Sequence, residues 1–92
     1  MYLEIISPEA TLFSGNVESL SVPGTDGSFQ VLENHAPIVS TLVNGNLEIK
    51  GTFDSSKSFD SLFKKIDSNS VSLEISSGTL ELQENKLILL VD

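Results

Sequence analysis

Few residues of this chain have the types and spacing that chemistry requires, and His35 comes first because it is the only histidine. It stands in the segment VPGTDGSFQVLENHAPIV, which also holds a Pro-Gly and an Asp-Gly turn signal. Nucleophilic catalysis needs a base within hydrogen-bonding reach of a serine or cysteine. His35 is the only usual base available, and no serine stands in a nucleophile-elbow motif. The sequence therefore indicates no catalytic constellation. His35 is either a contact residue for another protein or a histidine bonded within its own loop.

A metal site and a phosphate-binding loop have equally little support. Zinc needs three or four His, Cys or carboxylate ligands, and the chain has one histidine and no cysteine. The glycines of PGTDGS, Gly24 and Gly27, lack the GxxxxGK[ST] pattern and precede no expected helix. The acidic residues mostly occupy polar-facing strand positions, which is typical of a solvated surface. We expect no metal ion, no cofactor and no enzymatic activity of the chain itself.

The charge balance restricts the class of partner. The chain has 13 acidic residues against 5 lysines, which gives a net charge of −8. Binding of nucleic acid relies on Lys and Arg that neutralise phosphates, so we expect no nucleic-acid partner. The longest apolar run, LILLV at residues 87–91, is too short to cross a bilayer. We therefore expect protein partners that carry basic groups, and no direct insertion into a membrane.

The 92 residues predict a single domain, 1–92, composed mostly of short strands. Apolar residues alternate with polar ones between clusters of Gly, Pro, Asn and Ser, a pattern typical of a β-sandwich or barrel. Asn44-Gly45 is a strong signal for a two-residue hairpin. The expected strands are residues 2–6, 11–13, 18–22, 28–32, 38–43, 47–50, 71–76, 79–83 and 86–91.

One segment has a helical period instead. Phe59, Leu62, Phe63 and Ile66 stand at i, i+3, i+4 and i+7, which places them on one stripe of a helix. We predict a short inserted amphipathic helix near residues 58–66. Its apolar stripe either closes an open end or edge of the sheet or binds a partner.

The order of several short signatures resembles a known family. They are SPE, LFSG, VPGTDGSFQVL, NHAPIV and SGTLELQ, within residues 3–49 and 75–92. In this order and spacing the chain resembles the N-terminal β-sandwich domain of the epsilon subunit of rotary F-type ATP synthases. The resemblance implies a mainly β fold, a flattened β-sandwich of about ten short strands in two sheets.

The family also implies a function. The chain would be a non-catalytic rotor subunit in the central stalk of a proton- or sodium-driven ATP synthase. It would join the gamma subunit to the polar loops of the c-ring, transmit torque, and act on the alpha/beta catalytic hexamer indirectly. It would lie peripherally at the cytoplasmic face of a bacterial inner membrane. The alternative is a free-standing β-sandwich adaptor that binds a protein through the 59–66 helix.

Two features depart from the family pattern. The family usually continues into a C-terminal helical hairpin that restrains ATP hydrolysis, and we expect this chain to lack it. Residues 51–70 are longer than the hairpin usually found there, so we expect a family-atypical insertion that carries the helix.

The resemblance implies three groups of contact residues. The loop facing the c-ring would hold Thr25, Asp26, Gly27, Ser28 and Glu33; the interface with gamma or the ring would hold Ser7, His35 and Ser40; the face of the inserted helix would hold Phe59, Leu62, Phe63 and Ile66.

Overall fold

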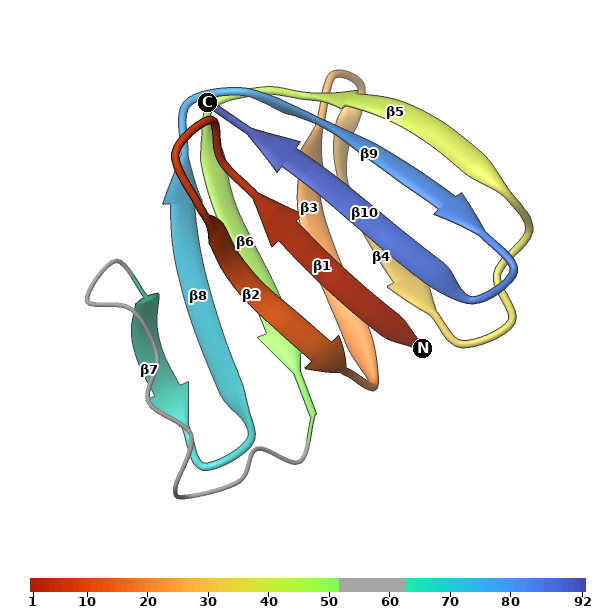
Figure 1. The fold of residues 1–92 in the computed structure, drawn as a ribbon, viewed down its shortest axis with the longest axis horizontal. Helices are drawn as coiled ribbons and strands as arrows, with labels where there is room; N and C mark the ends of the chain where they lie inside the picture. The colour runs from red at the N-terminus through yellow and green to blue at the C-terminus, as the bar shows by residue number, and fades with distance from the viewer. Residues whose placement is uncertain (52–62) are drawn as a thin grey trace.

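The structure, a computed structural model, describes residues 1–51 and 63–92, and strands are its only regular elements in these ranges. The predicted mainly β class and the number of strands are confirmed. No helix in the described ranges has the length and hydropathy of a membrane span. The ten strands, labelled in Figure 1, are β1 (Tyr2–Ile6), β2 (Thr11–Asn16), β3 (Ser19–Gly24), β4 (Gly27–Leu32), β5 (Ile38–Leu42), β6 (Gly45–Lys50), β7 (Phe63–Asp67), β8 (Ser70–Ile75), β9 (Gly78–Gln83) and β10 (Lys86–Val91).

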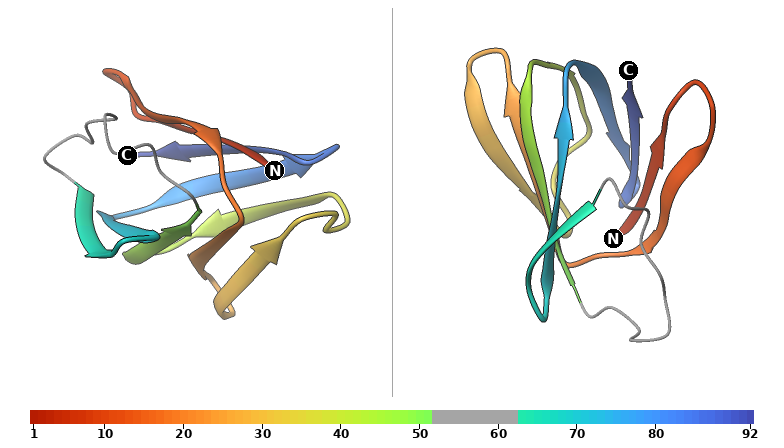
Figure 2. Two further views of the ribbon diagram at one scale, coloured as in Figure 1. Left: turned by 90° about the horizontal axis from the view of Figure 1, so that it is seen from below. Right: turned by 90° about the vertical axis from the view of Figure 1, so that its left-hand side faces the viewer.

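All ten strands belong to one hydrogen-bonded sheet. Its order is β2-β1-β10-β9-β5-β3-β6-β8-β7, and β4 pairs with β3 outside this path. The sheet curls over so that two halves face each other (Figure 2). We call β2, β1, β10, β9 and β5 the front half, because it faces the viewer in Figure 1, and β4, β3, β6, β8 and β7 the back half. The two layers of a flattened sandwich are present, but the expectation of two separate sheets is wrong. The layers are continuous through the pair Gly24↔Leu42 of β3 and β5.

The turn between β5 and β6 carries the chain from one half to the other. The Val43 N–H donates to the Pro23 carbonyl at 2.9 Å, which fixes this turn against the end of β3. A Cβ added at Gly45 would lie 2.8 Å from the Pro23 Cβ, so the close approach requires glycine. The predicted Asn44-Gly45 hairpin is wrong, because β5 pairs with β9 while β6 pairs with β3 and β8. Here Asn-Gly marks a crossing between layers.

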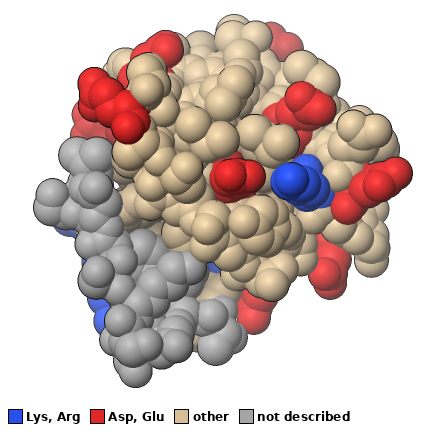
Figure 3. Space-filling model, viewed as in Figure 1, with Lys and Arg blue, Asp and Glu red and all other residues tan. Residues whose placement is uncertain are grey.

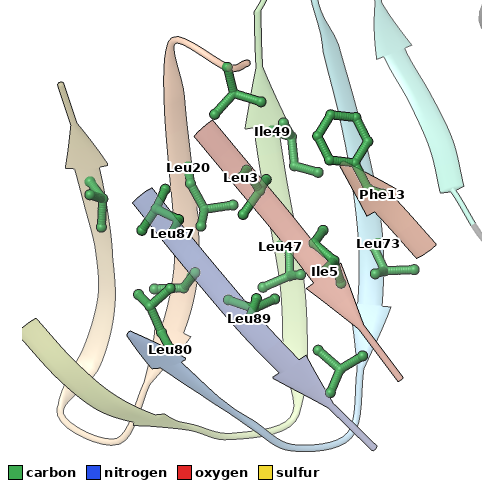
Figure 4. Packing of buried hydrophobic residues seen from close by; sticks show 14 of the residues in the cluster. Leu3, Ile5, Phe13, Leu20, Leu47, Ile49, Leu73, Leu80, Leu87 and Leu89 are labelled. Carbon is green, nitrogen blue, oxygen red and sulfur yellow. The ribbon is translucent and has the colours of Figure 1, made fainter. Parts of the chain in front are cut away.

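The core lies between the two halves. Strand alternation points every second side chain inward, so both inner faces are lined with branched aliphatic groups. Burial of one such side chain contributes about 1.5–3 kcal/mol of transfer free energy. Figure 4 shows these side chains pointing toward one another from both halves. The large, fully buried side chains are Leu3, Ile5, Leu20, Leu42, Leu47, Ile49, Leu80, Leu82, Leu87, Leu89, Val22 and Val31.

The predicted helix is wrong where the structure describes it. Phe63 and Ile66 lie on β7, which pairs antiparallel with β8. The Phe63 ring packs 6.4 Å from the Phe13 ring of β2, centroid to centroid, while Ile66 is exposed. The remaining helix positions, Phe59 and Leu62, lie outside the described residues. Pairing of this segment with β8 is more favourable than a helix whose apolar stripe is only two turns long.

Gly78, at the start of β9, provides a test of this packing. A Cβ there would lie 2.5 Å from the Leu90 carbonyl oxygen, which belongs to the backbone and cannot rotate away. We expect Gly78→Ala to lower the free energy of unfolding by about 1–3 kcal/mol, measured by urea denaturation. Ser76→Ala, at an exposed position two residues earlier, is the control and should change it by less than about 0.5 kcal/mol. Equal stability of the two variants would contradict the described approach of β9 and β10.

Candidate functional site

The described residues contain no cluster of reactive side chains that would indicate an active site. In the described part of the chain, no group of three or more His, Asp or Glu side chains could hold a metal ion. A cavity of ≈ 540 Å³ opens at the end of the sandwich where the chain finishes, and its walls are mostly apolar. Its one carboxylate, Asp92, accepts a hydrogen bond from the Ser77 hydroxyl, and the Asp92 N–H donates to the Ser77 carbonyl at 3.2 Å. These bonds extend the β9–β10 pairing, and the described residues that line the cavity include no histidine or lysine that could act as a base for the Ser77 hydroxyl.

His35 is exposed and bonded within its own loop. Its Nδ1 lies 2.7 Å from the Ala36 carbonyl oxygen, and its backbone N–H donates to the Leu32 carbonyl at 3.2 Å. Nδ1 therefore carries the proton, and Nε2 is the ring nitrogen turned outward. This supports the second role expected for His35, and the outward Nε2 leaves the contact role open to test.

Two contacts hold the loop of residues 33–37 against the rest of the fold. The Asn34 N–H donates to Asn85 Oδ1 at 2.8 Å, and Asn85 Nδ2 donates to Asn34 Oδ1 at 3.0 Å. The Met1 ammonium lies 3.2 Å from Glu33 Oε1. Asn34 and Asn85 have φ of 66° and 60°, a left-handed conformation that asparagine tolerates better than most residues. The loop that presents His35 is thus pinned to the turn between β9 and β10 and to the N-terminus.

The predicted contact residues lie at two opposite ends of the sandwich. Thr25 and Asp26 form the β3–β4 turn, whereas Glu33 and His35 follow the other end of β4 (Figure 1). Six residues of strand separate the two ends by about 20 Å. One loop therefore cannot present Glu33 together with residues 25–28. Ser40 lies half-buried on β5, between the two ends.

Ser7 belongs to the end that carries the β3–β4 turn. It closes the loop of residues 7–10: its N–H donates to the Ala10 carbonyl at 2.8 Å, and its Oγ accepts from the Ala10 N–H at 3.2 Å. The hydroxyl of Thr25 donates to the Thr41 carbonyl at 3.4 Å, which ties the β3–β4 turn to β5. We call residues 7–10 and 25–28 the turn end. Its exposed residues are small, apart from Pro8 and the two carboxylates of Glu9 and Asp26.

A large apolar surface lies on the outside of the front half, and sequence reasoning did not identify it. Val39 on β5 is 81% exposed and Leu90 on β10 is 50% exposed. Figure 3 views this side, where uncharged surface is interrupted by acidic side chains and by a basic one. The Lys86 ammonium lies 6.0 Å from the centre of the Tyr2 ring. Isolated exposed apolar residues are ordinary, but a set gathered over adjacent strands marks an interaction surface. We name it the outer apolar face and define it as Tyr2, Ile6, Val39, Ile88 and Leu90.

The strand register shows how charges are arranged on this face. Ile88 is paired with Glu4 of β1 on one side and with Glu81 of β9 on the other. Two residues further along β1 and β10, Ile6 is paired with Leu90. Carboxylates therefore flank an apolar centre at about 5 Å on each side, the spacing of neighbouring strands. The surface complements an apolar partner that carries basic groups at its rim.

The signal for this face was present in the sequence. The run LILLV of β10 has no alternation, so both of its sides are apolar. Only the structure shows that one of those sides is turned outward.

Comparison with known proteins identifies relatives over most of the chain. Residues 1–61 match the family model described as ATP synthase, Delta/Epsilon chain, beta-sandwich domain. The ATP synthase epsilon chain of Leptospira interrogans is 45% identical over 80 residues, which cover 86% of this chain and 63% of that protein. The ATP synthase epsilon chain of Chlorobium limicola is 33% identical over 90 residues, which cover 98% of this chain and 86% of that protein. The chain thus spans less than two-thirds of the length of the Leptospira relative.

Solved structures share the fold at low sequence identity. One is a chain of the Tetrahymena thermophila mitochondrial ATP synthase central stalk and c-ring, with a TM-score of 0.73, 14% identity and coverage of 98% of this chain and 61% of that chain. Another belongs to the Euglena gracilis mitochondrial ATP synthase, with a TM-score of 0.74, 15% identity and coverage of 97% of this chain and 48% of that chain.

The reciprocal bonds of Asn85 provide a test of how the 33–37 loop is held. Asn85→Gly removes the side chain but keeps the positive φ, because glycine adopts it freely. The two lost bonds, each of about 1 kcal/mol, should speed amide hydrogen exchange at Asn34 at least several-fold. Glu84→Gly is the matched control, since Glu84 has a φ of 52° in the same turn and an exposed side chain. Equal exchange rates at Asn34 in the two variants would show that the side-chain pair does not hold the loop.

Proposed function

This chain belongs to the family of ATP synthase epsilon chains, and on that basis we propose that it is a non-catalytic subunit of the central stalk. In this proposal it joins the gamma subunit to the polar loops of the c-ring of a proton- or sodium-driven ATP synthase. It transmits torque between them and affects the alpha/beta catalytic hexamer only indirectly. It lies peripherally, at the cytoplasmic face of a bacterial inner membrane, and is held there by its partners.

The observation that carries the proposal is the outer apolar face. Val39 is 81% exposed and Leu90 is 50% exposed, and β9 separates their strands on the same side of the sheet. Exposed apolar side chains gathered on one side of a sheet indicate a surface that a partner covers. We assign this face to gamma, because apolar contact supplies most of the binding free energy in the core of a stable protein interface. The loop with His35 precedes β5, so it fits the rim of this contact, whereas Ser40 is paired with the buried Leu80 and lies on the inner side of β5.

We assign the turn end to the c-ring. Its surface is made of short, tightly closed turns, in which Ser7 and Thr25 bond to neighbouring backbone. A pre-ordered turn loses little conformational entropy when it docks on another loop. The exposed Asp26 would orient the contact toward a basic group on the ring and contribute only about 0–1 kcal/mol of affinity. Glu33 follows the opposite end of β4, so the proposed contact with the ring is limited to residues of the turn end.

Torque transmission requires that the contacts do not slip and that the body between them does not shear. Continuity of the sheet through Gly24↔Leu42 and the shared aliphatic core couple the two halves mechanically. Load applied at the turn end therefore reaches the outer apolar face through paired strands. The adaptor alternative required a helix at 59–66, and β7 occupies residues 63–67.

Charge placed in the outer apolar face should weaken binding to gamma. Val39→Asp introduces a carboxylate where we expect an apolar partner, and Val39 is exposed enough that folding should be little affected. We expect the dissociation constant for the organism's own gamma subunit to rise by tenfold or more, about 1.4 kcal/mol, measured by calorimetry. Asn46→Asp adds the same charge on the exposed surface of the back half and should leave the affinity unchanged. If both variants bind gamma equally well, the assignment of this face is wrong.

Cross-linking can test the turn end separately, because the chain has no native cysteine. In the assembled complex, Thr25→Cys should form a disulfide with a cysteine placed in the polar loop of a c subunit. Glu84→Cys, at the opposite end of the sandwich, should remain unlinked under the same oxidation. A cross-link through Glu84→Cys alone would reverse the orientation that we propose.

A further inference from the structure

Among the described strands, β2, β7 and β4 have one edge without any partner strand, and β5 meets β3 only at the pair Gly24↔Leu42. Unpaired edges invite pairing with other chains, and proteins protect them with bulges, lysines or prolines. β2 has a register shift opposite Ile5 and Ile6. β7 has a shift between Lys65 and Asp67 and carries two lysines. Both of these edges therefore carry the usual protection.

β4 has none of these devices. Its sequence, GSFQVL, contains no charged residue and no proline. It is matched one-to-one with β3 over six residues without a register shift. An uncharged, regular strand of this length is the kind of edge that another strand extends.

The ladder shows which backbone groups face outward. The Pro23 carbonyl is bonded to Val43, away from β4, so Pro23 and Ser28 form a non-hydrogen-bonded pair. Pairing alternates along an antiparallel ladder, so the backbone groups of Ser28 and Gln30, with the Leu32 N–H, point to the open side. The side chains of Ser28 and Gln30 are exposed, and Leu32 is 54% exposed.

We propose that the open edge of β4 binds an extended segment of a partner protein, added as a further strand and carrying basic residues at its two ends. Asp26 stands at one end of β4 and Glu33 at the other, so the edge is an uncharged row between two carboxylates. The Met1 ammonium lies 3.2 Å from Glu33 Oε1, and the Glu33 side chain is still 65% exposed to a partner's basic group. A partner strand with lysine or arginine at both ends and small or β-branched residues between them complements this row. Main-chain hydrogen bonds would supply the affinity, and the charges at the two ends would fix the register of the added strand.

A second copy of the chain does not fit the same edge. Antiparallel pairing of β4 with itself would set Asp26 of each copy against Glu33 of the other. Parallel pairing would set Asp26 against Asp26 and Glu33 against Glu33. Either arrangement brings like charges together at both ends, between molecules that each carry a net charge of −8. The charge pattern therefore selects a basic partner and opposes self-association.

This proposal goes beyond the stalk function. Asp26 and Ser28 also belong to the turn end, so the two proposals are separated at the outer apolar face, which lies in the front half, whereas β4 lies in the back half. The probe is the capped peptide KTVTVTK, titrated into the labelled full chain and followed by amide shifts. We expect the shift changes to concentrate at Ser28, Gln30 and Leu32, and binding to weaken several-fold when the peptide ends are glutamate. Changes concentrated at Val39 and Ile88 would overturn the proposal.

Gln30→Pro removes one outward N–H without removing a bond to β3, so the fold should survive. We expect it to weaken peptide binding at least tenfold, while Gln30→Thr, which keeps the N–H, binds like the parent chain. If Gln30→Pro does not fold, Gln30→Lys provides the same test, because an edge lysine repels the basic peptide. Equal binding by Gln30→Thr and either disruptive variant would overturn the proposal, as would a β4-mediated dimer of the parent chain in sedimentation. Binding to gamma separates the two proposals. Gln30→Pro should still bind gamma, and Val39→Asp should still bind the peptide.

Discussion

The structure depends on the burial of two aliphatic surfaces against each other within one curled sheet. In a chain of 92 residues the core is only one layer of side chains thick, so almost every inward position is Leu, Ile or Val. Side chains that point outward from the sheet do not have to be apolar for the chain to fold. Their character reflects what they meet, and this makes the exposed apolar groups of the front half informative. The same constraint sets the crossing at Val43 and Gly45, where the chain must leave one half to supply the other.

The sequence predicted the strands well because alternation is a local signal. It failed where a local signal competed with pairing to a distant strand. Phe63 and Ile66 fit a helical stripe, but β8 offers a ready strand partner, and the pairing Phe63↔Leu73 prevails. Asn44-Gly45 fits a hairpin turn, yet the strands on either side separate into different layers, because their inward faces are needed in both.

The candidate site was predicted less completely than the fold. The type of loop around His35 followed from its residues, but neighbours along the chain do not reveal which end of a strand a loop occupies. Glu33 and Thr25 are eight positions apart in sequence and at opposite ends of the sandwich, because β4 runs between them. The outer apolar face combines residues from β1, β5 and β10, whose adjacency follows from the parallel pairing of β1 with β10 and from β9 between β10 and β5. No spacing along the chain encodes that arrangement.

A subunit that links other proteins must present surfaces that can be occupied at the same time. Here the outer apolar face and the turn end lie on different sides of one sheet, and the β4 edge runs from the turn end to the opposite end of the sandwich. An apolar face can supply affinity, whereas the carboxylates beside it supply mainly orientation, because exposed ion pairs are weak and screened. An acidic chain also repels its own copies while attracting basic partners. Rigidity follows from the same architecture: with the halves joined by continuous backbone pairing, a force on one surface deforms the others only by breaking ladder hydrogen bonds or opening the core. The simplest physical role for such an object is to hold larger partners in a fixed relation.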